Sequence, residues 1–319
     1  MTRVAPADAH AIALAAEILR DGGLVAFPTE TVYGLGADAT SPRAVAKIYA
    51  AKGRPSFNPL IAHVADMTAA RREAVLPPAA LRLAEAFWPG ALTLVAPAAA
   101  TGAVCDLARA GLASVALRVP DSRVALELLR AFGKPIAAPS ANVSGHVSPV
   151  TAAHVAQDLM GKVDLILDGG RTPAGLESTI VSFLGGRPAL LRPGAVPREA
   201  LEAVLGGRLD APPPGETGVF APGMTQAHYA PRARLRLEAE ALEEGEAGLD
   251  FAGQLRARAG AVILDLSPSG DLVEAAANLF AHLREFDARG CDKIAVAPVP
   301  SIGLGEAIND RLRRAASPR

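Results

Sequence analysis

The residues of this chain that are most able to do chemistry begin in the segment 28–59. A short apolar run at 24–27 predicts a buried strand, and threonines follow at its carboxyl end, where open α/β sheets bind ligands. Lys52 and Arg54 flank the glycine that ends a predicted helix over 42–52. A lysine point charge beside a planar arginine fork suits a polyphosphate. The pattern therefore predicts a phosphate-binding rim, with solvated surface charge and a tight turn as the alternative.

A second polar cluster lies in the segment 136–149, which reads IAAPSANVSGHVSP. Ser140, Asn142 and Ser148 follow a short apolar strand, and Gly145 lets the backbone approach a ligand closely. Hydroxyl and amide groups at a strand end can bind phosphate oxygens, a ribose or a carboxylate. On its own this segment is an ordinary polar loop, so its weight comes from its pairing with the first segment.

Taken together, the two segments resemble the signature of the YrdC family of L-threonylcarbamoyl-AMP synthases, with a lysine and an arginine in the first and Ser-x-Asn in the second. Further segments follow in the family's order: 58–61, His63, 87–90, 92–94, Ser114, Arg118, 177–181 and 191–194. The resemblance covers roughly residues 8–206. Beyond it, PGMTQAHYAP at 222–231 and GLGEAINDRLRRAA at 303–316 are similar to the family's long form, which carries a linker and an extra C-terminal domain.

The resemblance implies an enzyme that joins L-threonine, bicarbonate and ATP into L-threonylcarbamoyladenylate and pyrophosphate. Its product would supply a downstream tRNA threonylcarbamoyl transferase, which makes N6-threonylcarbamoyladenosine. Such a site needs a carboxylate clamp for the amino acid, cations for the triphosphate, and exclusion of water from labile intermediates. Mg²⁺ is expected with ATP, whose phosphates supply most of its ligands, and no tightly bound organic cofactor is expected.

Carried over residue by residue, the resemblance implies two sets of contacts. The implied ATP contacts are Arg54, Asn58, Ser114, Ser140, Asn142, Ser148, Arg192 and Tyr229. The implied L-threonine contacts are Thr31, His63, Arg118, Ala138 and Ser178, where Ala138 offers only its backbone or a close surface. Lys52 and Arg54 are expected to be catalytic, and no residue is expected to bind a metal.

Three of these residues have ordinary structural explanations as well. Arg118 lies in an apolar strand, where either a substrate carboxylate or an internal acid must pair with it. His63 suits a hydrogen-bonded core as readily as a ligand site. Tyr229 would ordinarily anchor a linker on a domain surface, whereas the resemblance implies that it reaches the nucleotide, which makes the linker a lid. We therefore expect the linker, rather than the core of the second domain, to serve the active site.

These side chains require a scaffold of alternating strands and helices, which the apolar pattern predicts as an α/β fold. The predicted strands are 24–27, 60–64, 92–96, 114–119, 136–138, 163–167, 178–183 and 189–192, and the predicted helices are 8–21, 42–52, 78–88, 122–132, 151–160 and 197–205. The short connection at 186–188 predicts a hairpin, so the sheet should be mixed. The resemblance implies that residues 1–206 form a twisted, YrdC-like catalytic domain with a central cavity.

The chain then becomes rich in proline and glycine, which predicts a linker over 207–231 and a second domain over 232–319. In this domain, strands are predicted at 235–237, 261–266 and 293–297, and helices near 247–259, 271–289 and 305–316. The alternation predicts a small, parallel, Rossmann-like layer. It carries no GxGxxG, so no nucleotide site is predicted there.

Composition predicts a cytoplasmic globular enzyme, with 50% hydrophobic and 20% charged residues and a net charge of −1. So small a net charge exerts no strong pull on nucleic acid or on anionic membranes, and at most a weak RNA contact is expected. Cys105 and Cys291 lie far apart and lack metal-ligand spacing. No apolar run approaches about 20 residues, so no membrane span is expected.

Two other classes of function compete with this interpretation. An RNA-binding module of the same fold would use a basic cavity, but the chain lacks interleaved basic and aromatic motifs. A carbamoyltransferase of hydrogenase maturation, whose chains contain a related domain, also needs zinc-binding cysteine sets, and this chain has 2 cysteines. ATP-dependent turnover in the absence of RNA would separate the enzyme from the RNA-binding module.

Overall fold

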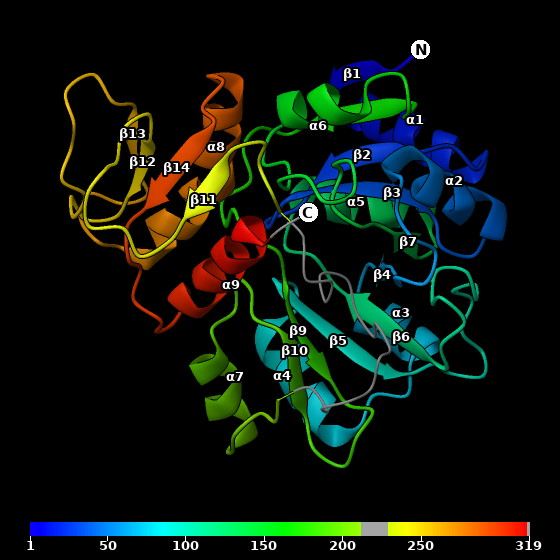
Figure 1. The fold of residues 1–319 in the computed structure, drawn as a ribbon. Coiled ribbons are helices and arrows are strands. Elements are labelled where there is room, and N and C mark those ends of the chain that lie inside the picture. The colour runs from blue at the N-terminus through cyan, green and yellow to red at the C-terminus, as the bar shows by residue number, and fades with distance from the viewer. Residues whose placement is uncertain (212–228, 318–319) are drawn as a thin grey trace.

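The computed structural model of the protein describes residues 1–211 and 229–317, so most of the predicted linker at 207–231 lies outside the described residues. Within them, the chain forms a 10-stranded mixed sheet and a separate 4-stranded parallel sheet (Figure 1). The α/β class predicted from the sequence is confirmed.

The larger sheet runs in the order β1-β8-β2-β3-β7-β4-β6-β5-β9-β10. Its strands are β1 (Arg3–Pro6), β2 (Val25–Pro28), β3 (Tyr33–Asp38), β4 (Ile61–His63), β5 (Leu92–Pro97), β6 (Ser114–Arg118), β7 (Ile136–Ala137), β8 (Leu165–Asp168), β9 (Thr179–Ser182) and β10 (Ala189–Arg192). The sheet contains parallel pairs, such as β4 with β6, and antiparallel pairs, such as β5 with β6. Strands β9 and β10 form the predicted antiparallel hairpin, which confirms that the sheet is mixed.

The helices that accompany this sheet are α1 (Ala9–Arg20), α2 (Pro42–Lys52), α3 (Met67–Glu73), α4 (Pro78–Phe87), α5 (Arg123–Phe132), α6 (Ala152–Leu159) and α7 (Arg198–Leu205). Helix α2 has the bounds that its sequence predicts. The Ser41 hydroxyl accepts a hydrogen bond from the Ala44 N–H at 3.3 Å, and Pro42 occupies the first turn. Gly53 ends the helix with φ of 60°, a left-handed conformation that glycine adopts without a steric penalty.

Strand β3 is not among the predicted strands, because two glycines interrupt its apolar pattern. The structure explains one of them. A Cβ atom on Gly36 would lie 2.7 Å from Phe27 Cε1 and 2.9 Å from Ile136 Cγ2, so side chains of the neighbouring strands occupy that space. The antiparallel pairing of β2 with β3 makes a tight turn at residues 29–32, and this turn brings two threonines to the edge of the sheet.

The smaller sheet contains β11 (Arg234–Arg236), β12 (Ala247–Asp250), β13 (Ile263–Asp265) and β14 (Lys293–Val296), in the order β11-β14-β12-β13. Its long helices are α8 (Leu272–Ala288) and α9 (Gly305–Ala316). The predicted parallel arrangement is confirmed. The helix predicted near 247–259 is wrong, because residues 247–250 form β12. This strand pairs with β13 and β14 on its two sides, and that long-range pairing overrides the local preference.

Helices α8 and α9 join the smaller sheet to the larger unit (Figure 1). On α9, Glu306 forms an ion pair with Arg198 of α7. The loop before β9 approaches α8 so closely that a Cβ atom on Gly175 would lie 2.5 Å from the Ala276 carbonyl oxygen. The two units are therefore packed against each other through specific contacts. Within residues 1–211 and 229–317, no helix is long and apolar enough to cross a membrane.

Candidate active site

One cavity gathers most of the residues that the sequence analysis selected. It encloses about 520 Å³ of empty space, including its opening. It lies where the turn after β2, strands β4 and β6, the loop after β7 and the start of β9 meet. The predicted residues that line it are Thr31, Arg54, His63, Arg118, Ala138, Ser140, Ser178, Arg192 and Tyr229. In the described part of the chain, the predicted residues Lys52, Asn58, Ser114, Asn142 and Ser148 do not line this cavity.

Arg54 enters the cavity just beyond the end of α2. One of its Nη2 hydrogen bonds goes to Asn58 Oδ1 at 2.5 Å and another to the Pro59 carbonyl at 3.1 Å. Burial lowers the pKa of Arg54 to about 10, so the guanidinium still carries its charge at neutral pH. Asn58 thus acts behind Arg54, holding a cation whose remaining surface faces the cavity.

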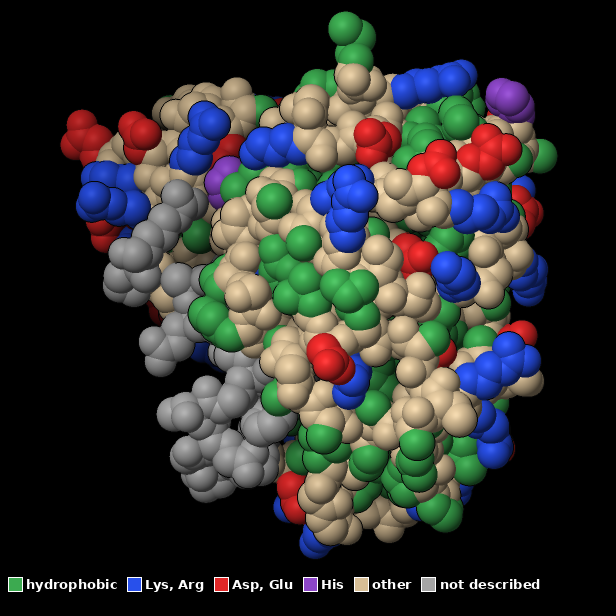
Figure 2. All heavy atoms as spheres, turned by 90° about the vertical axis from the view of Figure 1, so that its right-hand side faces the viewer, with side chains coloured by type: hydrophobic (Ala, Val, Ile, Leu, Met, Phe, Trp, Pro, Cys, Tyr) green, Lys and Arg blue, Asp and Glu red, His purple; other side chains and the backbone are tan. Residues whose placement is uncertain are grey.

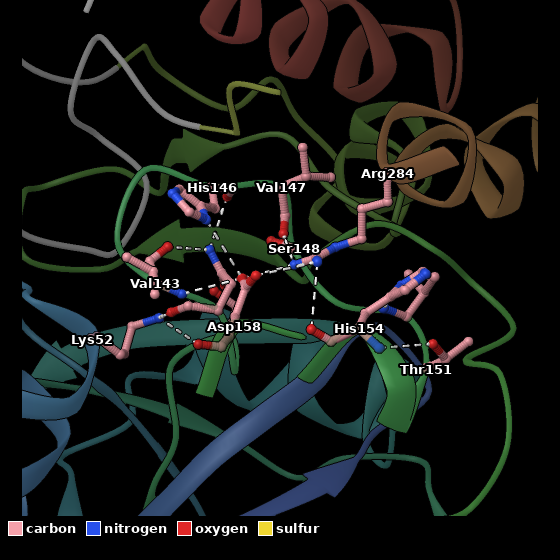
Figure 3. Close-up of polar contacts among 12 residues, drawn as sticks. Lys52, Val143, His146, Val147, Ser148, Thr151, His154, Asp158 and Arg284 are labelled. Carbon is pink, nitrogen blue, oxygen red and sulfur yellow. Dashed lines mark hydrogen bonds and ion pairs between the residues drawn. The ribbon is translucent and has the colours of Figure 1, made fainter. Parts of the chain in front are cut away.

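Lys52 lies behind the loop that follows β7 (Figure 3). Its Nζ donates to the carbonyl oxygens of Ser140 and Asn142, each at 2.5 Å, and the side chain is buried. Burial, and next the charge of Arg54, lower the pKa of Lys52 well below its usual value. The lysine therefore joins the two polar segments of the sequence to each other.

The loop over 140–148 is held from several sides. The Asn142 side-chain amide donates to the carbonyls of Val143 and His146, at 2.9 and 2.8 Å. Asp158 of α6 accepts from the Val143 N–H at 3.3 Å (Figure 3). The Asn142 amide nitrogen is therefore used within the loop, and Asn142 does not line the cavity.

Arg284 reaches this loop from α8 of the smaller unit, as Figure 3 shows. Its Nη2 donates to the Val147 carbonyl at 2.5 Å and pairs with Asp158 Oδ2 at 3.0 Å. Burial would raise the pKa of Asp158, but hydrogen bonds from His146 and Arg284 lower it to about 2. The Asp158 carboxylate is therefore ionised across the neutral range. Asp158 supports the loop from the larger unit and Arg284 supports it from the smaller one.

One wall of the cavity carries His63 and Arg118, which lie beside each other in register on β4 and β6. Burial, with the nearby charge of Arg118, lowers the pKa of His63 to about 3, so the imidazole is neutral at neutral pH. Its Nδ1 has no hydrogen-bond partner among the described residues. Arg118 Nη2 lies 2.6 Å from Glu30 Oε1, which realises the internal acid that the sequence left as one alternative.

Hydroxyl groups complete this wall. The hydroxyls of Thr29 and Thr31 lie 2.8 Å apart, and Ser178 pairs with Thr93 at 2.7 Å. Arg192 at the end of β10 donates through Nη2 to the Ser178 carbonyl at 2.8 Å. The cavity thus presents guanidinium groups together with small hydroxyls, a set that suits anionic groups and a hydroxylated ligand.

Glu177 is a lining residue that the sequence analysis quoted only as part of a motif. The Ser148 hydroxyl donates to Glu177 Oε1 at 2.5 Å, and Arg311 Nε donates to Oε2 at 2.8 Å. Burial alone would raise the pKa of Glu177, but the charges of Arg311 and Arg192 lower it below its usual value. Ser148 therefore lies behind a carboxylate that stays ionised at neutral pH.

Tyr229 combines the two explanations that the sequence offered for it. Its ring lines the cavity, and it also stacks on Phe280 of α8 with ring centroids 5.7 Å apart. Burial, followed by the charge of Glu177, raises the pKa of its phenol. Tyr229 is a protonated phenol at neutral pH. Ser114, by contrast, begins β6 opposite Pro97 and contributes to the sheet.

A metal ion at the cavity would need several acidic, histidine or cysteine side chains held close together. Within the part of the chain that the structure describes, no three His, Cys, Asp or Glu side chains gather closely enough to hold a metal ion. The nearby acids Glu30 and Glu177 are each engaged by an arginine. The donor set therefore does not fit a metal ion held by protein ligands alone.

Comparisons with known proteins agree along the whole chain. One protein family, described as "Telomere recombination" (Sua5_yciO_yrdC), matches residues 17–194, and a second, described as "Threonylcarbamoyl-AMP synthase, C-terminal domain", matches residues 196–317. The threonylcarbamoyl-AMP synthase of Bacillus subtilis is 44% identical over 97% of this chain and 93% of its own length. That of Pyrococcus abyssi is 43% identical over 97% of this chain and 94% of its own length.

A solved structure extends the agreement to three dimensions. The crystal structure of P. abyssi Sua5 complexed with L-threonine matches with a TM-score of 0.89 and 39% sequence identity. The match covers 99% of this chain and 97% of that one. Both sheets are therefore part of the similarity.

Proposed function

The chain belongs to the threonylcarbamoyl-AMP synthase family, and on that premise we propose that the cavity joins L-threonine, bicarbonate and ATP. The observation that carries this proposal is that Arg54, Arg118 and Arg192 line one cavity together with the hydroxyls of Thr31 and Ser178. Cations are needed for a triphosphate and for an amino-acid carboxylate, and hydroxyls can recognise the side chain of threonine.

The reaction that we propose has two steps. The threonine amine attacks the carbon of bicarbonate, an N–C bond forms, and water leaves to give a carbamate. A carbamate oxygen then attacks the α-phosphorus of ATP, a P–O bond forms, and the bond to the β-phosphate breaks to release pyrophosphate. No covalent intermediate with the protein is required, so positioning and charge stabilisation account for the catalysis.

The threonine end of the cavity is proposed at β4 and β6. Arg118 would pair with the substrate carboxylate, and its ion pair with Glu30 would hold the guanidinium in place beforehand. His63 is neutral and has a free Nδ1 among the described residues, so it can accept or donate one hydrogen bond without adding a charge. Thr31, Ser178 and the backbone at Ala138 would surround the threonine side chain.

The nucleotide end is proposed at Arg54, Arg192, Ser140 and Tyr229, with Asn58, Ser114, Asn142 and Ser148 in supporting positions. Arg54 remains the proposed catalytic cation, because it is held by Asn58 and lines the cavity. For Lys52 we propose a different contribution from the expected one. Its contacts make it a brace for the Ser140 loop, so it would act on catalysis through that loop.

Mg²⁺ would accompany ATP and neutralise phosphate charge. The acids beside the cavity are engaged by arginines, so the phosphates of ATP would supply most of the Mg²⁺ ligands. No step above is assigned to the Mg²⁺ ion. The residues of this chain bind the reactants, orient them and keep water out. That division agrees with a cavity lined by buried polar side chains such as Thr31, His63 and Arg118.

The finer organisation is also a proposal. Residues 1–206 would form a YrdC-like catalytic domain around the cavity, 207–231 a linker that acts as a lid, and 232–319 a Rossmann-like C-terminal domain. Tyr229 supports the lid, since this residue of the predicted linker lines the cavity. A cytoplasmic location and a downstream tRNA threonylcarbamoyl transferase as consumer of the product belong to the same proposal.

Pyrophosphate release from the purified full chain tests the function. We expect release with ATP and Mg²⁺ that stops when either threonine or bicarbonate is omitted. Valine in place of threonine should lower kcat/KM by at least about 100-fold, because it leaves the hydroxyl-binding groups unpaired. Release that is indifferent to both omissions would refute the reaction.

An RNA-binding module would require RNA for any effect of ATP. On the face seen in Figure 2, lysine and arginine side chains are interspersed with acidic ones, and the net charge is −1. That distribution favours small anions bound locally over a nucleic-acid strand. Turnover that appears only when RNA is added would favour the module instead.

A further inference from the structure

The motif GLGEAINDRLRRAA near the C-terminus has no part in the reaction proposed above, yet it places one charged side chain deep inside the molecule. Arg311 of α9 has a side-chain exposure of 0%. A guanidinium removed from water must be paired, since desolvation of an unpaired charge is costly. The partners of Arg311 therefore show what this helix does for the rest of the chain.

The first partners belong to the larger unit. Arg311 Nε donates to Glu177 Oε2 at 2.8 Å, and its Nη2 donates to the Pro193 carbonyl at 3.0 Å. Glu177 lines the cavity two residues before β9 begins at Thr179, and Pro193 directly follows Arg192 at the end of β10. A single side chain from α9 thus spans the ends of two neighbouring strands that carry cavity residues.

The second partner is the ring of Tyr229. The guanidinium carbon of Arg311 lies 4.9 Å from the ring centroid, a cation–π arrangement, and the ring stacks on Phe280 of α8. Tyr229 itself has φ of 65°, a conformation that a non-glycine residue holds only when its surroundings compensate. Contacts from α8 and α9 therefore keep this ring in the cavity wall.

We propose that Arg311 is the positioning residue through which the C-terminal unit orders the active site, by fixing the Glu177 carboxylate and the Tyr229 ring. The inference rests on the proposed function and adds a requirement to it. From the sequence we expected the linker, rather than the core of the second domain, to serve the active site. The contacts of Arg311 mean that the linker tyrosine depends on that core.

The charges around Glu177 come from two elements. Arg311 reaches it from α9 and Arg192 from β10, while Ser148 donates a neutral hydrogen bond. Of these two charges, that of Arg311 lowers the pKa of Glu177 more. Removing Arg311 should therefore raise the pKa of Glu177. If the cavity needs Glu177 ionised, the acidic limb of the activity profile will then move to higher pH.

The test uses the purified full chain with ATP, Mg²⁺, L-threonine and bicarbonate, and it follows pyrophosphate release against pH. We expect Arg311→Lys and Arg311→Met each to lower kcat/KM on the order of 10- to 100-fold, the usual scale for a residue that orients a contact residue. In Arg311→Met the acidic limb should also shift to higher pH. Glu306→Gln is the matched control, because it breaks another pair between α9 and the larger unit.

A double variant keeps the test decisive if Arg311→Met folds poorly. Arg311→Met with Glu177→Gln removes both charges of the buried pair, so it avoids an isolated buried carboxylate. If Arg311 acts through Glu177, the double variant will lose no more activity than Glu177→Gln alone, a comparison that does not need a folded Arg311→Met protein. A double variant markedly less active than Glu177→Gln would show that Arg311 does not act through this carboxylate and would overturn the inference.

Two further outcomes would contradict the proposals. A folded Arg311→Met enzyme with the kcat/KM and pH profile of Glu306→Gln would show that Arg311 only docks the two units, and the proposal would fail. A wild-type enzyme that releases no pyrophosphate would instead refute the proposed function, and with it the positioning built on it.

Discussion

Lys52 donates a hydrogen bond to the backbone carbonyl of Ser140 at 2.5 Å, and this contact joins the end of α2 to the loop after β7. The same ammonium group donates to the Asn142 carbonyl. Both carbonyl groups lie on a loop that lines or borders the cavity. The hydrogen-bond partners of Lys52 are backbone carbonyl groups of the loop. We therefore infer that Lys52 holds the loop in place.

Lys52→Met should destabilise the protein and lower its activity together. The change leaves two buried carbonyls without a donor, each worth about 1–3 kcal/mol, so the free energy of unfolding should fall by about 2 kcal/mol or more. Urea unfolding and pyrophosphate release measure the two effects. Lys47→Met on the same helix is the control, because Lys47 donates to the Gly22 carbonyl from an exposed position. Equal stability of both variants would contradict the brace.

Arg54→Ala should separate activity from stability. This guanidinium faces the cavity from its hydrogen bonds with Asn58, so its removal should lower kcat/KM for pyrophosphate release by at least about 100-fold, as expected for a main charge stabiliser. The thermal midpoint should change much less than the rate. The exposed Arg43→Ala on α2 should behave like wild type. Near-normal release by the Arg54 variant would remove it from the phosphate site.

His63 should make stability depend on pH. Its pKa is about 3 in the folded protein and about 6.5 when unfolded, so the unfolded state binds the proton first. Its contribution is complete above about pH 6.5 and declines as the pH falls toward 3, by up to about 1.4 kcal/mol per pH unit.

His63→Gln lacks that titration. Between pH 7 and pH 5, wild type should therefore lose about 2 kcal/mol more unfolding free energy than this variant. Denaturant unfolding at the two pH values measures the difference, and His10→Gln, at an exposed position, should keep the wild-type slope. A parallel loss in wild type and His63→Gln would mean that the imidazole is not neutral in the fold.

Gly175→Ala should weaken the contact between the two sheet units. Gly175 has φ of 65°, and its Cβ would lie 2.5 Å from the Ala276 carbonyl of α8. An alanine here would be strained by the positive φ and would clash with the backbone of α8. Together these effects should lower the free energy of unfolding by about 1–3 kcal/mol. Gly186→Ala is a matched control, because its Cβ would meet nothing within 4 Å. If neither variant changes the thermal midpoint, α8 can move away from residue 175 without a cost in stability, which would contradict a close contact between the two units.

Local chemistry made part of this fold predictable. Helix α2 begins after Ser41 and ends at Gly53 because both caps act within a few residues. The hairpin of β9 and β10 follows from a connection too short for anything else. The site residues carried over by resemblance, such as Thr31, Arg54 and His63, could also be named from the sequence. Each belongs to a short motif that is contiguous in the chain.

Tertiary structure decided the rest, because the deciding contacts join residues far apart in sequence. Strand β12 lies where local preference favours a helix, and pairing with β13 and β14 prevailed. Lys52 lies two residues before Arg54 in the chain, yet the packing of α2 against the loop after β7 directs it to carbonyl groups. Arg311 meets Glu177 across 134 residues, and no local pattern encodes a buried ion pair whose stability depends on desolvation by both units at once.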